Sequence, residues 1–357
     1  MIPRLSAASG DVGVDTIYDP ERGGEVMRKK IVVHTGAPPG APLMEERRVL
    51  DAPDIELIAR GPCRTPAKVL EAVRDADVAL CGSEPYTGEV FAQAPRLKMV
   101  VRYGIGVDTV DLDAATEHGV IVANFPDFCI REVANHALAL MLGCARKLLR
   151  VDRALRGEGW RTSREFRTPA GPIHGETLGL VAFGNIARAL AKRARTLEMQ
   201  VIAYDPYVEP SVFAQAGVES VSLEDVASRS DYVSCHPPLT PETRGMIDSA
   251  FFARMKPTAY FINTSRGAVV KETDLIAALR EHRIAGAGLD VYEAEPIGPD
   301  HPLCALDNVI LTPHLGSYTD PTFLSLYRRV GEATLAVLRG GVPEFVANPE
   351  VLDRRRT

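Results

Sequence analysis

The feature that most constrains the fold of this chain is a strand–turn–helix–strand segment between Gly175 and Asp205. The apolar run 178–183 predicts a buried strand, 188–197 carries apolar residues at helical spacing, and 200–204 predicts a second strand. A short turn containing Gly184 joins the first strand to the helix. This order is typical of a parallel βαβ unit that binds a dinucleotide, with the pyrophosphate at the helix N-terminus.

The turn of this unit departs from the glycine pattern G-x-G-x-x-G. Ala182 and Ala187 replace the first and third glycines, and only Gly184 remains. Alanine is an accepted variant at the third place, which governs helix–strand packing, whereas the methyl group of Ala182 lies where the turn is tightest. An acidic residue about twenty positions further on, here Asp205, is placed to bond both ribose hydroxyls and to repel a 2′-phosphate. We therefore expect NAD as the cofactor, bound by Gly184, Asn185, Ile186 and Asp205.

The rest of the chain also alternates short apolar runs with helical patterns, which indicates parallel sheets. Strands are predicted at residues 31–34, 55–59, 78–81, 99–102 and 120–124, and again at 232–235, 260–263, 286–289 and 309–311. The expected fold class is α/β, with two doubly wound parallel-sheet domains of the Rossmann or flavodoxin-like type. We expect a nucleotide-binding domain at residues 126–316, inserted into a substrate domain made of residues 29–125 and 317–357.

Three segments lie outside this alternation. Residues 130–155 predict one long amphipathic helix, and a final helix is expected at about 322–339. The arginine-rich arm at 157–172 is irregular, and it is interpreted either as a dimer-clasping segment or as an exposed loop. Residues 1–28 show no clear periodicity and are expected to form a flexible extension, with Met27 as a plausible second translation start.

Composition narrows the function classes. The chain is 46% hydrophobic and 25% charged, as soluble globular proteins are, and its net charge of -6 offers no basic field for nucleic acid. No apolar run approaches the length needed to span a bilayer, and the N-terminus lacks the apolar region of a signal peptide. The six cysteines are scattered without a C-x-x-C pair, so we expect reduced, mostly buried thiols rather than disulfides or zinc ligands. These features favour a cytoplasmic protein with no bound metal, and neither nucleic acid nor a membrane is expected as a partner.

Polar residues follow three of the later predicted strands. They are Thr264-Ser265-Arg266-Gly267, the segment from Asp290 to Glu295-Pro296, and Thr312-Pro313-His314-Leu315-Gly316. Open α/β sheets bind ligands at the carboxyl ends of their strands, so these segments are candidates for a catalytic site. Taken singly, each has an ordinary alternative: a surface charge for Arg266, a turn for the segment of His314, and a turn cap for Glu295.

In order and spacing these segments resemble the D-isomer-specific 2-hydroxyacid dehydrogenase family. That family includes phosphoglycerate dehydrogenase, glyoxylate/hydroxypyruvate reductase and the C-terminal-binding proteins. The resemblance runs from Lys30 to about Leu352, and it includes Asn124-Phe-Pro-Asp127 and His236-Pro-Pro-Leu-Thr240. It implies hydride transfer between NADH and a 2-oxo acid.

The resemblance assigns catalytic roles to three residues. Arg266 matches the family's catalytic arginine, whose guanidinium can hold carboxylate and carbonyl oxygens together. His314 matches the acid/base histidine, which supplies a proton to the developing alkoxide. Glu295 matches the partner glutamate, which holds the imidazole ring and favours its protonated form.

The resemblance also implies further cofactor contacts. Asp290 is expected to accept a hydrogen bond from the nicotinamide amide, with a helix or turn cap as the alternative. His236 is expected to be a packing or cofactor-side residue rather than an acid/base, because His314 already fills that role. The remaining residues expected on the cofactor side are Pro237, Thr264, Ser265 and His314.

The N-terminal domain is expected to supply the rest of the substrate pocket. Small residues at Gly104 and Gly106 would let the backbone N–H groups of about Ile105 and Gly106 approach the substrate carboxylate, although a simple strand-to-helix turn is the alternative. Glu84 is expected either to favour a polar or cationic substrate tail or to face solvent. Ser317 stands where C-terminal-binding proteins place a bulky tryptophan, which suggests a roomier or more polar pocket.

Two other functions compete with the dehydrogenase. One is an NAD(H)-sensing scaffold like the C-terminal-binding corepressors, which keep the same three catalytic residues. The other is formate-dehydrogenase-like hydride abstraction, which Glu295 disfavours because that branch pairs glutamine with its histidine. Lys271, where the family usually has aspartate, is expected to be peripheral. A homodimer formed through the nucleotide-binding domain is expected from the family, and the sequence does not predict which 2-oxo acid is the substrate.

Overall fold

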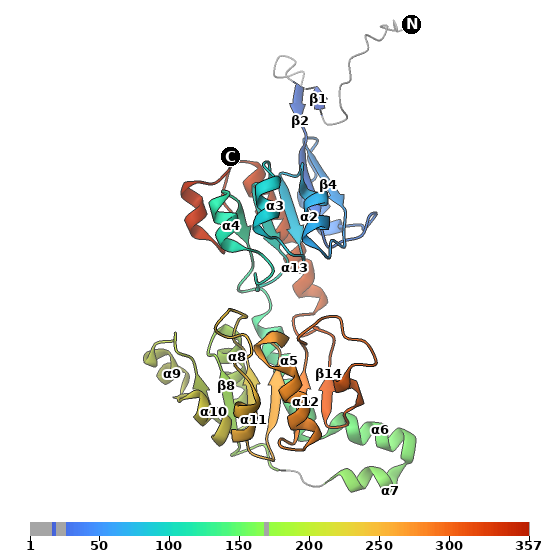
Figure 1. Ribbon diagram of the computed structural model, residues 1–357, viewed down its shortest axis with the longest axis vertical. Coiled ribbons are helices and arrows are strands. Elements are labelled where there is room, and N and C mark those ends of the chain that lie inside the picture. Colours follow the sequence, from blue (N-terminus) through green and yellow to red (C-terminus); the bar gives the residue numbers. More distant parts are fainter. Residues whose placement is uncertain (1–15, 19–25, 168–170, 357) are drawn as a thin grey trace, which may run out of the picture. The chain divides into compact units, whose positions relative to one another are not determined.

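The computed structural model describes residues 16–18, 26–167 and 171–356, which form two compact units (Figure 1). Unit 1 comprises the chain up to Phe128 and again from Asp320, and unit 2 runs from Cys129 to Thr319. Each unit contains its own parallel sheet, flanked by helices. The predicted α/β fold with two parallel-sheet domains is therefore confirmed.

Unit 1 is built on a five-stranded parallel sheet with the strand order β4-β3-β5-β6-β7. Its strands are β3 (Lys30–His34), β4 (Ile55–Ala59), β5 (Val78–Cys81), β6 (Met99–Arg102) and β7 (Ile121–Ala123). Its helices are α1 (Met44–Val49), α2 (Pro66–Val73), α3 (Gly88–Gln93), α4 (Leu112–Glu117), α13 (Asp320–Leu338) and the 3-10 helix Pro349–Asp353. Helices α2, α3 and α4 bury one face of the sheet, and α13 buries the other.

Unit 2 is built on a seven-stranded parallel sheet with the strand order β10-β9-β8-β11-β12-β13-β14. Its strands are β8 (Thr177–Val181), β9 (Gln200–Tyr204), β10 (Glu219–Ser220), β11 (Tyr232–Cys235), β12 (Tyr260–Asn263), β13 (Gly286–Leu289) and β14 (Val309–Leu311). Its α-helices are α5 (Ile130–Ala145), α6 (Leu148–Glu158), α7 (Trp160–Ser163), α8 (Asn185–Thr196), α9 (Pro210–Ala216), α10 (Leu223–Arg229), α11 (Ser249–Arg254) and α12 (Glu272–Arg280). Short 3-10 helices lie at Arg164–Arg167, Gly267–Val269 and Pro302–Ala305.

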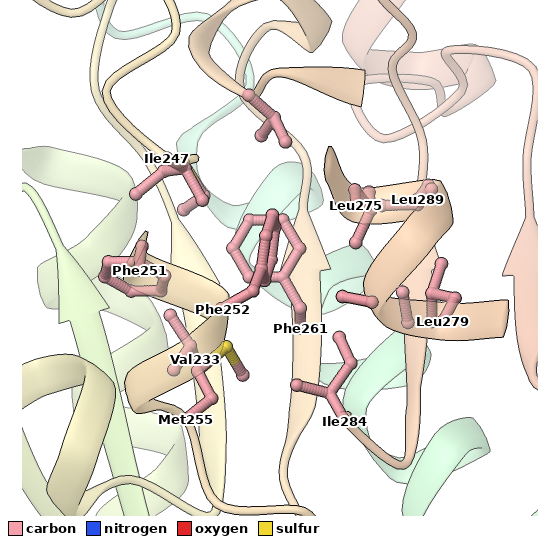
Figure 2. Packing of buried hydrophobic residues seen from close by; sticks show 14 of the residues in the cluster. Val233, Ile247, Phe251, Phe252, Met255, Phe261, Leu275, Leu279, Ile284 and Leu289 are labelled. Atoms are coloured by element: carbon pink, nitrogen blue, oxygen red, sulfur yellow. The ribbon is translucent and has the colours of Figure 1, made fainter. Parts of the chain in front are cut away.

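Two apolar layers hold the sheet of unit 2. On one face, α10, α11 and α12 pack against it around Phe252 and Phe261, whose rings meet edge to face with centroids 5.5 Å apart (Figure 2). On the other face lie α5 and α8. Helix α5 approaches closely because Gly288 leaves room for it: a Cβ at Gly288 would lie 2.9 Å from Cβ of Leu140. This close packing brings α5 over the strands whose ends carry the candidate catalytic residues.

The predicted long helix at 130–155 was wrong. Helix α5 ends at Ala145, the chain turns at Lys147 with a φ of 51°, and α6 begins at Leu148. The buried stripe of α5 ends with Cys144 and Ala145, whereas Ala154 is the one buried residue of α6. The helix thus breaks where it stops covering the sheet, without a glycine or proline to mark the position.

Other helix and strand boundaries also differ from those predicted. The arm at 157–172, predicted to be irregular, contains α7 and a 3-10 helix, and residues 168–170 lie outside the described part of the chain. The strand predicted at 178–183 ends at Val181, because Ala182 takes a left-handed backbone conformation. The following helix begins at Asn185 rather than at Arg188.

Most of the expected extension at 1–28 lies outside the described residues, but part of it pairs with itself. Strand β1 (Thr16–Tyr18) pairs antiparallel with β2 (Val26–Arg28), which the sequence did not predict. All six cysteines are free thiols, and all but Cys304 are buried, as predicted. Among the described residues, no helix is both long and apolar enough to cross a membrane.

Candidate active site

The carboxyl ends of six strands in unit 2, all except β10, lie in register. Tyr204 pairs with Val181, Val181 with Cys235, Cys235 with Asn263, Asn263 with Leu289, and Leu289 with Leu311. The next residue of each strand therefore stands in one row along the edge of the sheet. That row consists of Asp205, Ala182, His236, Thr264, Asp290 and Thr312. Several residues singled out from separate motifs thus meet at one edge.

At the turn between β8 and α8, the backbone is open toward a ligand. Gly184 is the N-cap of α8, and a Cβ placed on it would meet no atom within 4 Å. The first turn of α8 carries no acidic residue, so nothing there would repel an anion from the positive end of the helix dipole. The side chain of Arg188, one turn further on, donates to Oδ1 of Asn185 and adds a cation near this end. The turn therefore fits a pyrophosphate.

Ala182 has a φ of 68°, a conformation that favours glycine. The protein's own hydrogen bonds hold it there: the N–H of Ala182 donates to the carbonyl of Tyr204 at 2.8 Å, and the N–H of Phe183 donates to Oδ2 of Asp205 at 2.8 Å. Oδ1 of Asp205 accepts from the N–H of Tyr207 at 2.9 Å. Asp205 therefore fixes the turn, and each of its oxygens keeps a second lone pair for a ribose hydroxyl.

Three candidate cofactor residues further along this edge of the sheet, His236, Thr264 and Ser265, have different surroundings. Nε2 of His236 lies 2.9 Å from Oγ of Ser234, and burial lowers the pKa of His236 to about 4, so this ring is neutral near pH 7. Ser265 donates to Oδ1 of Asn263 through both its N–H, at 3.0 Å, and its hydroxyl, at 2.9 Å. The hydroxyl of Thr264 is buried and has no hydrogen-bond partner in the described part of the chain. Since a buried hydroxyl without a partner is costly, Thr264 fits a ligand contact.

The candidate acid/base pair is formed. Nδ1 of His314 lies 2.8 Å from Oε2 of Glu295, and Oε1 of Glu295 accepts from the N–H of Tyr292 at 3.0 Å. Burial raises the pKa of Glu295, but the hydrogen bond and charge of His314, the N–H of Tyr292 and the charge of Arg266 outweigh it, and the net pKa is lowered. Glu295 is therefore ionised near neutral pH, and Nε2 is the ring nitrogen of His314 that remains for a substrate.

Arg266 follows β12 and lies close enough to Glu295 to affect its pKa. Its Nη1 donates to the carbonyl of Ser265 at 2.7 Å, and its own carbonyl accepts from Nδ2 of Asn263 at 3.1 Å. Gly267 allows the loop of Glu295 to approach, because a Cβ there would lie 1.8 Å from the carbonyl carbon of Tyr292. The glycine that follows Arg266 is thus explained by the close approach of two backbones.

Asp290 is 1% exposed, and its carboxylate organises the loop that carries His314. Oδ1 accepts from the hydroxyl of Thr312 at 2.6 Å and from the N–H of Leu315 at 2.9 Å, while Oδ2 accepts from the N–H of Gly316 at 2.8 Å. This is the turn-cap alternative considered for Asp290. Its contact with the nicotinamide amide remains a prediction.

The candidates in unit 1 lie at the carboxyl edge of the five-stranded sheet. Glu84 follows β5, and its Oε2 accepts from the N–H of Gly82 at 2.7 Å. Gly104, after β6, has a φ of 141°, and Nδ2 of Asn124 donates to the carbonyl of Ile105 at 2.7 Å. Ser317, in contrast, belongs to unit 2 and follows the loop of His314. The substrate contacts predicted for Glu84, Ile105, Gly106 and Ser317 remain predictions.

One residue of this region was missed by the sequence reasoning. His136 of α5 lies with its Nε2 2.9 Å from Oγ1 of Thr312 and 3.3 Å from Oδ1 of Asp290. In the sequence, the feature that could have identified it is its position beside the buried stripe of α5, next to Ala137. A histidine at such a position is usually a packing residue. Only the fold brings it to residues more than 150 positions away.

Comparison with known proteins places this geometry in a family. The model of the D-isomer-specific 2-hydroxyacid dehydrogenase NAD-binding domain matches residues 138–316. The chain belongs to the D-isomer-specific 2-hydroxyacid dehydrogenase family. It is 40% identical over 290 residues to a glyoxylate reductase of Korarchaeum cryptofilum, covering 80% of this chain and 87% of that protein.

Two further relatives define how far the similarity extends. A D-3-phosphoglycerate dehydrogenase of Mycobacterium leprae is 44% identical over 294 residues, which cover 82% of this chain and 54% of that protein. The present chain thus spans about half the length of this relative. The crystal structure of a D-lactate dehydrogenase from Aquifex aeolicus, complexed with NAD and lactic acid, matches with a TM-score of 0.78 at 25% identity, covering 91% of this chain and 98% of that one. This chain is therefore an NAD-dependent oxidoreductase acting on CH–OH donors.

Proposed function

We propose that this dehydrogenase interconverts a small 2-oxo acid and its D-2-hydroxy acid, with Arg266, Glu295 and His314 as its catalytic residues. The observation that carries the proposal is the 2.8 Å contact between Nδ1 of His314 and Oε2 of Glu295, at the strand ends of the NAD-binding unit. A histidine held in this way has one ring nitrogen fixed and the other open to a substrate. That is the arrangement an acid/base requires.

The role of His314 follows from the hydrogen bond at Nδ1. With Glu295 ionised, Nδ1 keeps its proton, so gain or loss of a proton takes place at Nε2. In the direction of reduction, Nε2–H donates to the carbonyl oxygen of the substrate and the ring becomes neutral without reorienting. The imidazole side chain is 46% exposed, which leaves it accessible to a substrate. NAD, when bound in its reduced form, supplies the hydride.

Arg266 is proposed to bind the substrate. A guanidinium can donate two hydrogen bonds to a carboxylate and a carbonyl oxygen of one 2-oxo acid, a geometry that a lysine ammonium does not offer. Its positive charge also stabilises the oxygen that becomes negative during reduction. The proximity of Arg266 to Glu295 supports this role, because it places the cation at the same strand ends as His314.

The remaining predicted contacts form the rest of the proposal. The backbone N–H groups of Ile105 and Gly106 bind the substrate carboxylate, and Glu84 and Ser317 contribute to its selection. The cofactor residues are Gly184, Asn185, Ile186, Asp205, His236, Pro237, Thr264, Ser265, Asp290 and His314.

The test is oxidation of NADH followed at 340 nm with a panel of 2-oxo acids. Glyoxylate, 3-phosphohydroxypyruvate and pyruvate correspond to the relatives reported above, and hydroxypyruvate corresponds to the family resemblance. Arg266→Ala and His314→Ala should each retain less than a tenth of the wild-type rate while still binding NADH, given the usual contribution of an acid/base group. Tight NADH binding without turnover of any acid would contradict the proposal and favour an NAD(H)-sensing scaffold.

We also propose a homodimer formed through unit 2. Helices α6 and α7 extend from the body of this unit (Figure 1) and expose apolar side chains to solvent. Trp160 is 69% exposed and Leu148 is 55% exposed, an unusual exposure for residues of this kind. Light scattering of the wild type and of Trp160→Ser tests this: a monomer for the wild type would contradict the proposal.

A further inference from the structure

His136, on α5, begins a directed chain of hydrogen bonds in unit 2. Its Nε2 lies 2.9 Å from Oγ1 of Thr312, and Oγ1 of Thr312 donates to Oδ1 of Asp290 at 2.6 Å. A hydroxyl has one proton, which Thr312 uses on the carboxylate, so Nε2 of His136 carries the proton of its own contact. Donation therefore runs from His136 to Thr312 and from Thr312 to Asp290, and His136 also lies 3.3 Å from Oδ1 of Asp290.

The chain ends on a carboxylate that is ionised although buried. Burial raises the pKa of Asp290, but the hydrogen bonds from His136, Thr312 and the N–H groups of Leu315 and Gly316 lower it by more, so the net pKa falls below its ordinary value. Hydrogen bonds to an ionised group are stronger than those between neutral groups. The charge on Asp290 thus tightens both the chain from His136 and the bonds to the loop.

The loop held by Asp290 is the one that presents His314. His314 has a φ of 54°, in the left-handed region that costs a non-glycine residue energy. Its N–H donates to the carbonyl of Asp290 at 2.8 Å, while the side chain of Asp290 binds the next two N–H groups. A strained residue persists where its surroundings determine its conformation from several sides, and Asp290 does so before and after His314.

We propose that His136 is a positioning residue for the reaction, acting through Thr312 and Asp290 on the loop of His314. Through its hydrogen bond to Thr312 and its 3.3 Å contact with Oδ1 of Asp290, it fixes the carboxylate that holds this loop in the conformation in which Nδ1 of His314 meets Glu295. The link to catalysis rests on the proposed function of His314 as the proton donor. The positioning itself does not depend on it.

The experiment compares His136→Leu, which removes the donor, with His136→Gln, whose amide N–H₂ can donate in its place. Asn135→Ala is the matched control, since Asn135 precedes His136 on α5 but binds Arg193, at 2.7 Å, instead of the loop. Thr312→Val breaks the same chain at its second member with little change in shape. Each variant is assayed for kcat, for KM of the best 2-oxo acid of the panel, for NADH binding by fluorescence and for hydrogen–deuterium exchange of peptides covering 312–319.

We expect His136→Leu and Thr312→Val to lower kcat at least tenfold with KM changed less than threefold, and to speed exchange at Leu315 and Gly316. His136→Gln should restore most of the rate and the protection, and Asn135→Ala should match the wild type. The inference is overturned if His136→Leu matches Asn135→Ala in both readouts, or if His136→Gln loses as much rate as His136→Leu. A wild type that reduces no 2-oxo acid would refute the proposed function instead, while the exchange data would still decide the role of His136.

Discussion

Replacing Ala182 by glycine should stabilise unit 2 without changing its affinity for NADH. Ala182 stands at the first glycine place of the dinucleotide turn with a φ of 68°. An L-residue held in the left-handed region costs about 1–2 kcal/mol relative to the right-handed one. Glycine removes this cost but adds conformational freedom to the unfolded chain, worth about 0.4–1 kcal/mol in the opposite direction.

Taken at their midpoints of about 1.5 and about 0.7 kcal/mol, the two terms leave a gain of about 0.8 kcal/mol in the free energy of unfolding. For a unit of this size that corresponds to a rise in Tm of about 1–4 °C. The affinity should not follow, because the conformation is held by the protein's own bonds from Ala182 to Tyr204 and from Phe183 to Asp205. The strain is then the same with and without the cofactor and cancels from the dissociation constant.

The assay is thermal unfolding together with NADH titration by fluorescence. Glu198→Gly provides a matched control, because Glu198 is an exposed residue of the same unit with a φ of 62° and lies outside the cofactor turn. Both variants should unfold at higher temperature, and both should keep the wild-type dissociation constant within about twofold. A lower Tm for Ala182→Gly would refute the strain argument. Binding tightened tenfold, or about 1.4 kcal/mol, would show instead that the methyl group obstructs the cofactor.

Three other perturbations have defined outcomes. Gly267→Ala should abolish turnover and lower Tm, since its Cβ would overlap the backbone of the loop of Glu295. Gly298→Ala is the control: its Cβ would meet no atom within 4 Å, so turnover and Tm should stay at the wild-type values. Glu295→Gln should lower kcat at least tenfold with NADH binding unchanged, because an amide holds the ring of His314 without favouring its protonated form; a wild-type kcat would contradict the pairing. Burial lowers the pKa of His236 to about 4 in the folded protein, from an ordinary value of 6.5. Between these two pH values the unfolded chain therefore binds more protons than the folded one. The free energy of unfolding should fall as the pH drops from about 6.5 to 4, by at most about 1.4 kcal/mol per pH unit. Denaturant titrations should show a flatter dependence for His236→Asn, and an identical slope would reject the buried neutral ring.

Much of the fold could be predicted because the strands are short apolar runs followed by polar residues. The predicted strands at 78–81, 99–102, 260–263 and 286–289 coincide with β5, β6, β12 and β13. Parallel strands buried on both faces are apolar throughout, and the first polar residue marks the end of the strand. The same change from apolar to polar identified Asp205, Thr264 and Asp290, which is why residues of the predicted site fall in one row.

The missed features depend on contacts that no local pattern contains. The break at Lys147 follows from where α5 stops covering the sheet, and the sequence there has neither glycine nor proline. The need for glycine at 267 arises from the backbone of Tyr292, and the role of His136 from residues that only the packing of α5 brings near. Each is a consequence of tertiary structure rather than of propensity.

Two residues at the carboxyl edge of the sheet of unit 2 have strained backbones, and the reasons for the strain differ. Ala182 and His314 both have left-handed backbones, and both are held there by hydrogen bonds from neighbouring strand ends. At position 182 the methyl group has no chemical task, so glycine should serve at least as well. At position 314 the imidazole is required, and glycine would relieve the strain only by removing the proton donor. The backbone strain at His314 is therefore inseparable from the proposed function. It is offset by the hydrogen bonds that the buried carboxylate of Asp290 accepts from the loop, and His136 supports this carboxylate through Thr312.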